Sequence, residues 1–122
     1  MIFATHRPRV LIVDDEPANL KVMREILGNQ YRLSFAKSGE AALTLLEKEL
    51  PKLILLDIMM PHMNGFEVCE HVKRNPKTAH IPIIFVTALG DESDEYKGFE
   101  LGAVDYITCL LYTSDAADES VS

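Results

Sequence analysis

Four polar residues stand at points where this sequence changes abruptly from apolar to polar. In chain order, the residues that follow three separate apolar runs are Asp14 with Asp15, Asp57, and Thr87. Carboxylates that lie within a few ångströms of one another repel unless a cation or protons intervene. Such oxygen ligands suit a hard divalent ion like Mg²⁺, which commonly combines one or two carboxylates with waters and phosphate oxygens. If the fold brings these residues together, they predict a magnesium site that also accepts phosphate.

The three runs, residues 10–13, 53–56 and 83–86, are apolar at every position, as in strands that helices cover on both faces. Two weaker strands are predicted at residues 31–36 and 104–107. Helical patterns alternate with the strands, which predicts a single α/β domain with a parallel, doubly wound sheet. Ligands of such sheets bind beyond the carboxyl ends of the strands, so we expect the four polar residues to meet at one edge.

Four helices are predicted between the strands, and each has a recognisable start and end. The marker residues are Pro17 and Gly28, Ser38 and Pro51, Asn64 and Asn75, and Asp91 and Gly102. Gly28 is expected at the C′ position of the first helix, and Asn64 with Glu67 predicts a capping box for the third. Phe99 and Leu101, near the end of the fourth, are expected in the core.

Composition excludes several classes of function. The net charge is -7 and no run of Lys or Arg is present, so we expect no direct nucleic-acid binding by this segment. No signal peptide or membrane-spanning run is found, so we expect a soluble, cytoplasmic protein without a membrane partner. Cys69 and Cys109 have no metal-ligand spacing and no disulfide-framework density, and we expect one packed thiol and one incidental one. The histidines His62, His71 and His80 are expected at the surface.

Four ordered blocks of the sequence resemble the receiver domains of bacterial response regulators in two-component signalling. The blocks are residues 11–16 (LIVDDE), 55–61 (LLDIMMP), 86–88 (VTA) and 102–108 (GAVDYIT). The resemblance implies the flavodoxin-like fold, a five-stranded parallel sheet of strand order 2-1-3-4-5. It also implies a cytoplasmic phosphoprotein that switches conformation rather than an enzyme of rapid turnover.

The same resemblance assigns a role to each residue of the site. Asp57 would accept the phosphoryl group of a histidine kinase or a phosphotransfer protein. The Mg²⁺ ligands would be Asp15, Asp57 and the backbone carbonyl of Met59, with Asp14 contributing through water. Thr87 would donate its hydroxyl to the phosphate, and Tyr106 would be the aromatic switch. Homodimerisation through the fourth helix and fifth strand is also usual in the family.

The pattern breaks after Thr108, where receiver domains place a lysine followed by proline and this chain has Cys109 and Leu110. Loss of one fixed electrostatic stabiliser typically costs on the order of 10²–10³ in rate. Residues 109–119 offer no amphipathic stripe for a fifth helix, and they resemble one translated reading frame of a sequencing-library adapter. We therefore predict a receiver domain over residues 1–108, an artefactual tail over 109–122, and a missing or aberrant fifth helix.

Two alternative interpretations stay open. If Cys109 is native, the chain is a divergent receiver that lost its lysine, a non-phosphorylated pseudo-receiver acting as a protein-interaction module. An unrelated doubly wound phosphatase with an aspartate nucleophile is less consistent with the sequence. Such enzymes generally carry a second aspartate two residues after the first, where this chain has Met59.

Overall fold

The computed structural model describes residues 7–87, 97, 99–103 and 105–108 of the chain. Strands and helices alternate along it. The strands are β1 (Arg9–Val13), β2 (Arg32–Ala36), β3 (Leu53–Leu56), β4 (Ile83–Thr87) and β5 (Asp105–Thr108). The helices with complete bounds are α2 (Pro17–Leu27), α3 (Gly39–Lys48) and α4 (Gly65–Arg74). In the described part of the chain, no helix has the length and apolar character needed to cross a membrane.

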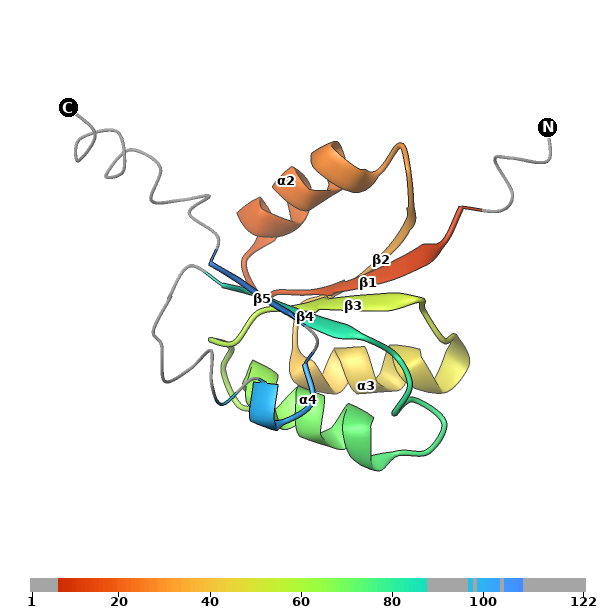
Figure 1. The fold of residues 1–122 in the computed structure, drawn as a ribbon. Helices are drawn as coiled ribbons and strands as arrows, with labels where there is room; N and C mark the ends of the chain where they lie inside the picture. The colour runs from red at the N-terminus through yellow and green to blue at the C-terminus, as the bar shows by residue number, and fades with distance from the viewer. Residues whose placement is uncertain (1–6, 88–96, 98, 104, 109–122) are drawn as a thin grey trace.

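The five strands form one parallel sheet in the order β2-β1-β3-β4-β5, as predicted. The chain first pairs β1 with β2, then crosses to the other side of β1 to place β3, and continues outward to β4 and β5. This reversal next to β1 is the topological switch point of a doubly wound sheet. It brings the carboxyl ends of β1 and β3 side by side, and Figure 1 shows those ends on the same side of the sheet.

Helices cover the sheet on both faces (Figure 1). α3 and α4 lie on one face, where they bury strand residues such as Leu11, Ile54 and Phe85 in the larger core cluster. α2 lies on the other face, where Leu20 packs with Val10 and Ile12 in a smaller cluster. The alternation of strand side chains between these clusters explains why the strands are apolar at every position.

The predicted helix ends are confirmed for the most part. Pro17 occupies the first turn of α2, Ser38 Oγ accepts from the Ala41 N–H, and Asn64 forms a complete capping box with Glu67. Gly28 was expected at the C′ position, and the structure places it one residue earlier, as the C-cap of α2. Its backbone angles are right-handed (φ -62°), and its N–H continues the helical pattern to the Arg24 carbonyl.

Two expectations near the end of the fourth predicted helix have different outcomes. Leu101 packs against the larger core cluster, as expected, and Gly102 has the left-handed φ of 104° that ends a helix. Phe99 is 45% exposed, so its assignment to the core was wrong. Its helical position turns the ring outward, which apolar character alone does not reveal. The start of this helix, the tail at 109–122 and the fifth helix lie outside the described residues.

Candidate metal centre at the carboxyl edge of the sheet

The structure brings Asp14, Asp15 and Asp57 together, as the strand pattern predicts. One carboxylate oxygen from each lies within 4.8 Å of the other two. Backbone hydrogen bonds beyond the strand ends set this spacing. The Asp14 N–H donates to the Ala36 carbonyl (3.0 Å), and the Asp57 N–H donates to the Val13 carbonyl (2.9 Å). The carboxylates therefore project from adjacent strands at a fixed register.

The three carboxylates differ in their exposure and in their partners. Asp14 and Asp57 are 8% and 6% exposed, whereas Asp15 is exposed. Asp14 is held at both oxygens, because the Glu16 N–H donates to Oδ1 (2.9 Å) and Asn19 Nδ2 donates to Oδ2 (3.1 Å). Asp57 Oδ1 accepts from the Ile58 N–H (2.9 Å). Two buried carboxylates are thus oriented, and the third faces solvent.

Burial raises the pKa of Asp14 above its ordinary value, because the ionised form loses hydration. The hydrogen bonds from Glu16 and Asn19 act in the opposite direction, and the neighbouring Asp15 charge raises the pKa further. Burial and a like charge both oppose ionisation in this cluster, so a bound cation would stabilise its ionised carboxylates. The oxygen-only donor set fits a hard divalent ion, which is the fit expected for Mg²⁺.

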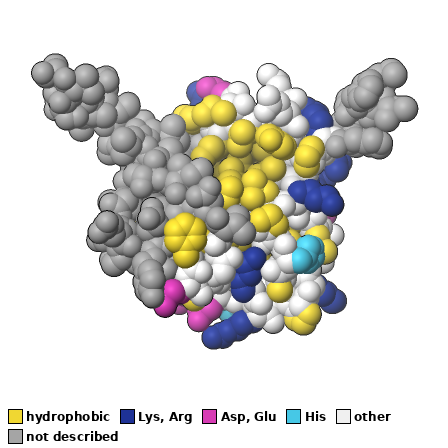
Figure 2. Space-filling view, viewed as in Figure 1, with side chains coloured by type: hydrophobic (Ala, Val, Ile, Leu, Met, Phe, Trp, Pro, Cys, Tyr) yellow, Lys and Arg dark blue, Asp and Glu magenta, His cyan; other side chains and the backbone are white. Residues whose placement is uncertain are grey.

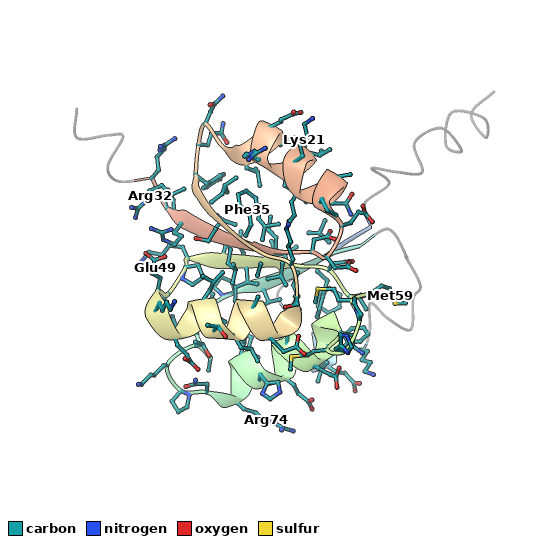
Figure 3. All side chains as sticks on the ribbon, turned by 180° about the vertical axis from the view of Figure 1, so that it is seen from behind. Lys21, Arg32, Phe35, Glu49, Met59 and Arg74 are labelled. Atoms are coloured by element: carbon teal, nitrogen blue, oxygen red, sulfur yellow. The ribbon has the colours of Figure 1, made fainter. Side chains whose placement is uncertain are left out.

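Met59 and the residues after it form the loop between β3 and α4. The Met59 side chain is 59% exposed and points away from the ribbon (Figure 3), whereas Met60 is buried. His62 is exposed and has a left-handed φ of 70°, a conformation uncommon outside glycine. His71 and His80 are exposed as well, so the prediction of surface histidines is confirmed.

Thr87 and Tyr106 lie on neighbouring strands, as the sequence predicts. Thr87 is the last residue of β4 and pairs in register with Thr108, while Tyr106 of β5 pairs with Phe85. The positions of the Thr87 and Tyr106 side chains, and the whole of Cys109, lie outside the described residues. The structure therefore confirms the strand positions of the two switch candidates, and their roles stay predictions.

Two residues of the site escaped the sequence analysis. Asn19 is buried with 7% exposure and binds Asp14 from the first turn of α2. Gly65 begins α4 so close to β3 that an added Cβ would collide with the Asp57 carbonyl oxygen, and its N–H donates to the Ile58 carbonyl (2.8 Å). Asn19 follows Asp14 by five residues at a helix start, which is the one signal that could have suggested it.

Comparisons with known proteins agree with this geometry. Residues 10–110 match the response regulator receiver domain family. The chain is 50% identical over 98 residues to a probable cyclic di-GMP phosphodiesterase of Vibrio cholerae serotype O1, covering 80% of this chain and 22% of that protein. This chain spans about a fifth of the length of the curated relatives it matches first, 22% in both cases.

Solved structures show the same fold. The N-terminal domain of a response regulator receiver protein from Methanoculleus marisnigri JR1 is 35% identical, with a TM-score of 0.80 over 93% of both chains. The Mn²⁺-bound form of the response regulator Rcp1 is 28% identical, with a TM-score of 0.79 over 92% of this chain and 88% of that one.

Proposed function

Since this chain belongs to the response regulator receiver domain family, we propose that Asp57 accepts a phosphoryl group from a histidine kinase or a phosphotransfer protein. The observation that supports this proposal is the placement of Asp57, buried at the end of β3 with two further carboxylates beside it. Receiver domains act in signalling with histidine kinases. That such a kinase donates the phosphoryl group to this chain is part of the proposal. We also propose a bacterial, cytoplasmic setting for it.

Mg²⁺ is the ion that we propose for the acidic cluster. Asp15, Asp57 and the Met59 carbonyl would hold it, with Asp14 contributing through water. When bound, the ion would offset the negative charge that accumulates as a phosphoryl group approaches three carboxylates. The binding of Mn²⁺ by the related Rcp1 supports a divalent cation in this family. The oxygen donors of this chain suit the harder Mg²⁺ equally well.

The residues of the chain itself orient the reacting carboxylate. The Ile58 N–H donates to Asp57 Oδ1 and so helps to orient this carboxylate. A carboxylate oxygen of Asp57 is proposed to attack phosphorus. A P–O bond to Asp57 forms, the P–N bond of the phosphohistidine breaks, and the donor imidazole keeps the electron pair. Positioning of this kind provides much of the catalysis in phosphoryl transfer.

Thr87 and Tyr106 are proposed to convert the phosphate into a conformational change. The Thr87 hydroxyl would donate to a phosphoryl oxygen, and Tyr106 would turn inward as Thr87 moves. Thr87 lies on β4 and Tyr106 lies on β5, and these two strands are paired. A movement of Thr87 would therefore occur on the strand next to that of Tyr106. One phosphate would then bias a two-state equilibrium, as in other phosphorylation switches.

Intact mass spectrometry tests the proposal directly. The protein is incubated with Mg²⁺ and acetyl phosphate, and the mass of one added phosphoryl group is expected. Asp57→Asn should abolish the addition, whereas Glu40→Gln, an exposed acid on α3, should retain it. Addition that persists in Asp57→Asn would exclude Asp57 as the acceptor.

Cys109 supports the second candidate, a non-phosphorylated pseudo-receiver that acts through protein interaction. A neutral thiol cannot replace the ammonium expected at this position to bind the phosphoryl oxygens. The variant Cys109→Lys separates the two candidates. Labelling that appears or accelerates on restoring the lysine supports the phosphoacceptor, and no labelling in either form supports the pseudo-receiver.

Homodimerisation through the fourth helix and β5 is a further proposal, for which sedimentation with and without phosphodonor is the test.

A further inference from the structure

A basic groove lies between α2 and the edge strand β2. It has a volume of about 260 Å³ and is lined by Pro17, Leu20, Lys21, Arg24, Phe35 and Lys37. Leu20 is buried and Phe35 is half-buried, so the floor is apolar. Figure 3 shows Phe35 between β2 and α2, with Lys21 on the helix.

The rim of the basic groove has a charge opposite to that of the whole chain. Lys21, Arg24 and Lys37 are exposed and no acidic residue lines the groove, although the chain carries a net charge of -7. Ion pairs among the described residues join Arg9 to Glu49 and Arg74 to Glu70, and none involves the three cations of the rim. The local excess of positive charge is therefore available to an anionic partner.

The strand beside the groove is also open to a partner. Among the described strands, β2 pairs with β1 alone and forms one edge of the sheet. The outer backbone N–H and C=O groups of an edge strand can hydrogen-bond an added extended segment. The basic groove and the free strand edge adjoin, so one extended chain could use both.

A second groove, at the C-terminal ends of α3 and α4, is larger but fits an anionic partner less well. Its volume is about 680 Å³, and both acidic and basic side chains line it, among them Glu47, Lys48 and Lys77. Such mixed charge selects neither sign strongly. The smaller basic groove thus has the clearer chemical preference.

We propose that the basic groove binds an acidic, extended segment of a partner polypeptide that places one aromatic or aliphatic side chain against Phe35. The three cations would attract the acidic residues, and the apolar floor would anchor the side chain. Rim charges mainly set specificity and association rate, while a buried apolar anchor contributes most of the affinity. This proposal does not depend on phosphorylation of Asp57.

Selection from a phage-displayed library of random short peptides tests the proposal on the full chain. The enriched peptides should be acidic with one apolar or aromatic residue. Synthetic versions should perturb the amide NMR signals of residues 18–24 and 35–37. The double variant Lys21→Glu/Lys37→Glu should weaken their binding at least about tenfold.

The matched control is Lys52→Glu/Lys77→Glu, which makes the same change in net charge at exposed lysines outside the basic groove. It should leave binding within about twofold, since neither lysine lines the groove and salt screens charges that do not contact the peptide. Equal losses in both double variants would reduce the effect to overall charge and overturn the proposal.

Three other outcomes would also overturn it. The first is enrichment of peptides without acidic residues, or NMR shifts that map elsewhere. The second is the absence of enrichment, which would leave the rim cations only the role of discouraging edge-to-edge pairing of β2. The third is binding to phosphatidylserine vesicles or single-stranded DNA that depends on Lys21 and Lys37 while no peptide is selected.

Discussion

The two faces of the sheet have equally apolar strand residues but differ in how well those residues are buried. On β4, Ile83 and Phe85 face α3 and α4 and are both 0% exposed. Ile84 and Val86 alternate with them toward the α2 face and are only half-buried. Figure 2 shows a hydrophobic area at the surface beside α2. An apolar strand pattern therefore predicts that both faces can be covered, and the helices decide how completely each one is.

The sharpest test of this difference uses two neighbouring isoleucines of β4. Ile83→Ala should lower the free energy of unfolding by about 2–5 kcal/mol, because a cavity remains in a packed core. Ile84→Ala should cost only about 1 kcal/mol, because the half-buried site loses less transfer free energy and its surroundings can fill with water. Urea denaturation measures both, and the slopes should agree between the variants.

Equal losses at the two positions would show that the α2 face is as tightly packed as the other. The comparison is controlled internally, because the substitution, the strand and the change in β-propensity are the same. Only the face differs.

The fold could be predicted from sequence because each apolar strand stops at a polar residue and each helix has a marked end. The parallel sheet, its order and the capping box at Asn64 follow from such local signals and from the family resemblance. The outward position of Phe99 could not be predicted, because an apolar residue near a helix end is equally consistent with either side of the helix.

The acidic cluster was predictable for a different reason. Parallel strands end at a common edge, so residues that follow β1 and β3 must meet there. Asn19 and Gly65 were not predicted because their roles depend on distances between elements. One hydrogen-bonds Asp14 across a turn, and the other allows α4 to approach the Asp57 backbone. The approach of α4 at Gly65 is not encoded in a run of neighbouring residues, and for Asn19 the spacing of five residues from Asp14 is the one local signal.

The thiol of Cys69 offers a pH-dependent test of the well-covered face. Cys69 is 0% exposed on α4, and its Sγ lies 3.6 Å from the Leu101 carbonyl oxygen. Burial raises its pKa from 9.0 to about 11. The folded state thus holds this proton more tightly than the unfolded state. The contribution of the thiol to the free energy of unfolding is therefore fully present below pH 9, and it is lost as the pH rises toward 11. The loss should reach at most about 3 kcal/mol.

Cys69→Ala is the control for that titration. The variant is less stable at every pH, but the part of the alkaline slope caused by the thiol should disappear. Lysine and tyrosine groups titrate in both proteins and cancel in the difference. If the free energies of unfolding of the two proteins changed in parallel between pH 9 and 11, the folded state would tolerate the thiolate. Water would then reach this face more readily than the burial of Cys69 indicates.

The smallest expected effect concerns Val86, on the partly covered face. Val86→Thr should cost less than about 1 kcal/mol, because water can reach the new hydroxyl at a half-buried site. Val13→Thr, at a position 1% exposed in the larger core cluster, should cost about 1–3 kcal/mol, because a buried hydroxyl without a partner loses its hydration. The native-state fluorescence of an apolar dye such as anilinonaphthalene sulfonate should fall in Val86→Thr if the dye binds the hydrophobic area beside α2. Unchanged dye binding with a stability loss as large as that of Val13→Thr would mean that Val86 is buried in solution, and that the two faces are covered alike.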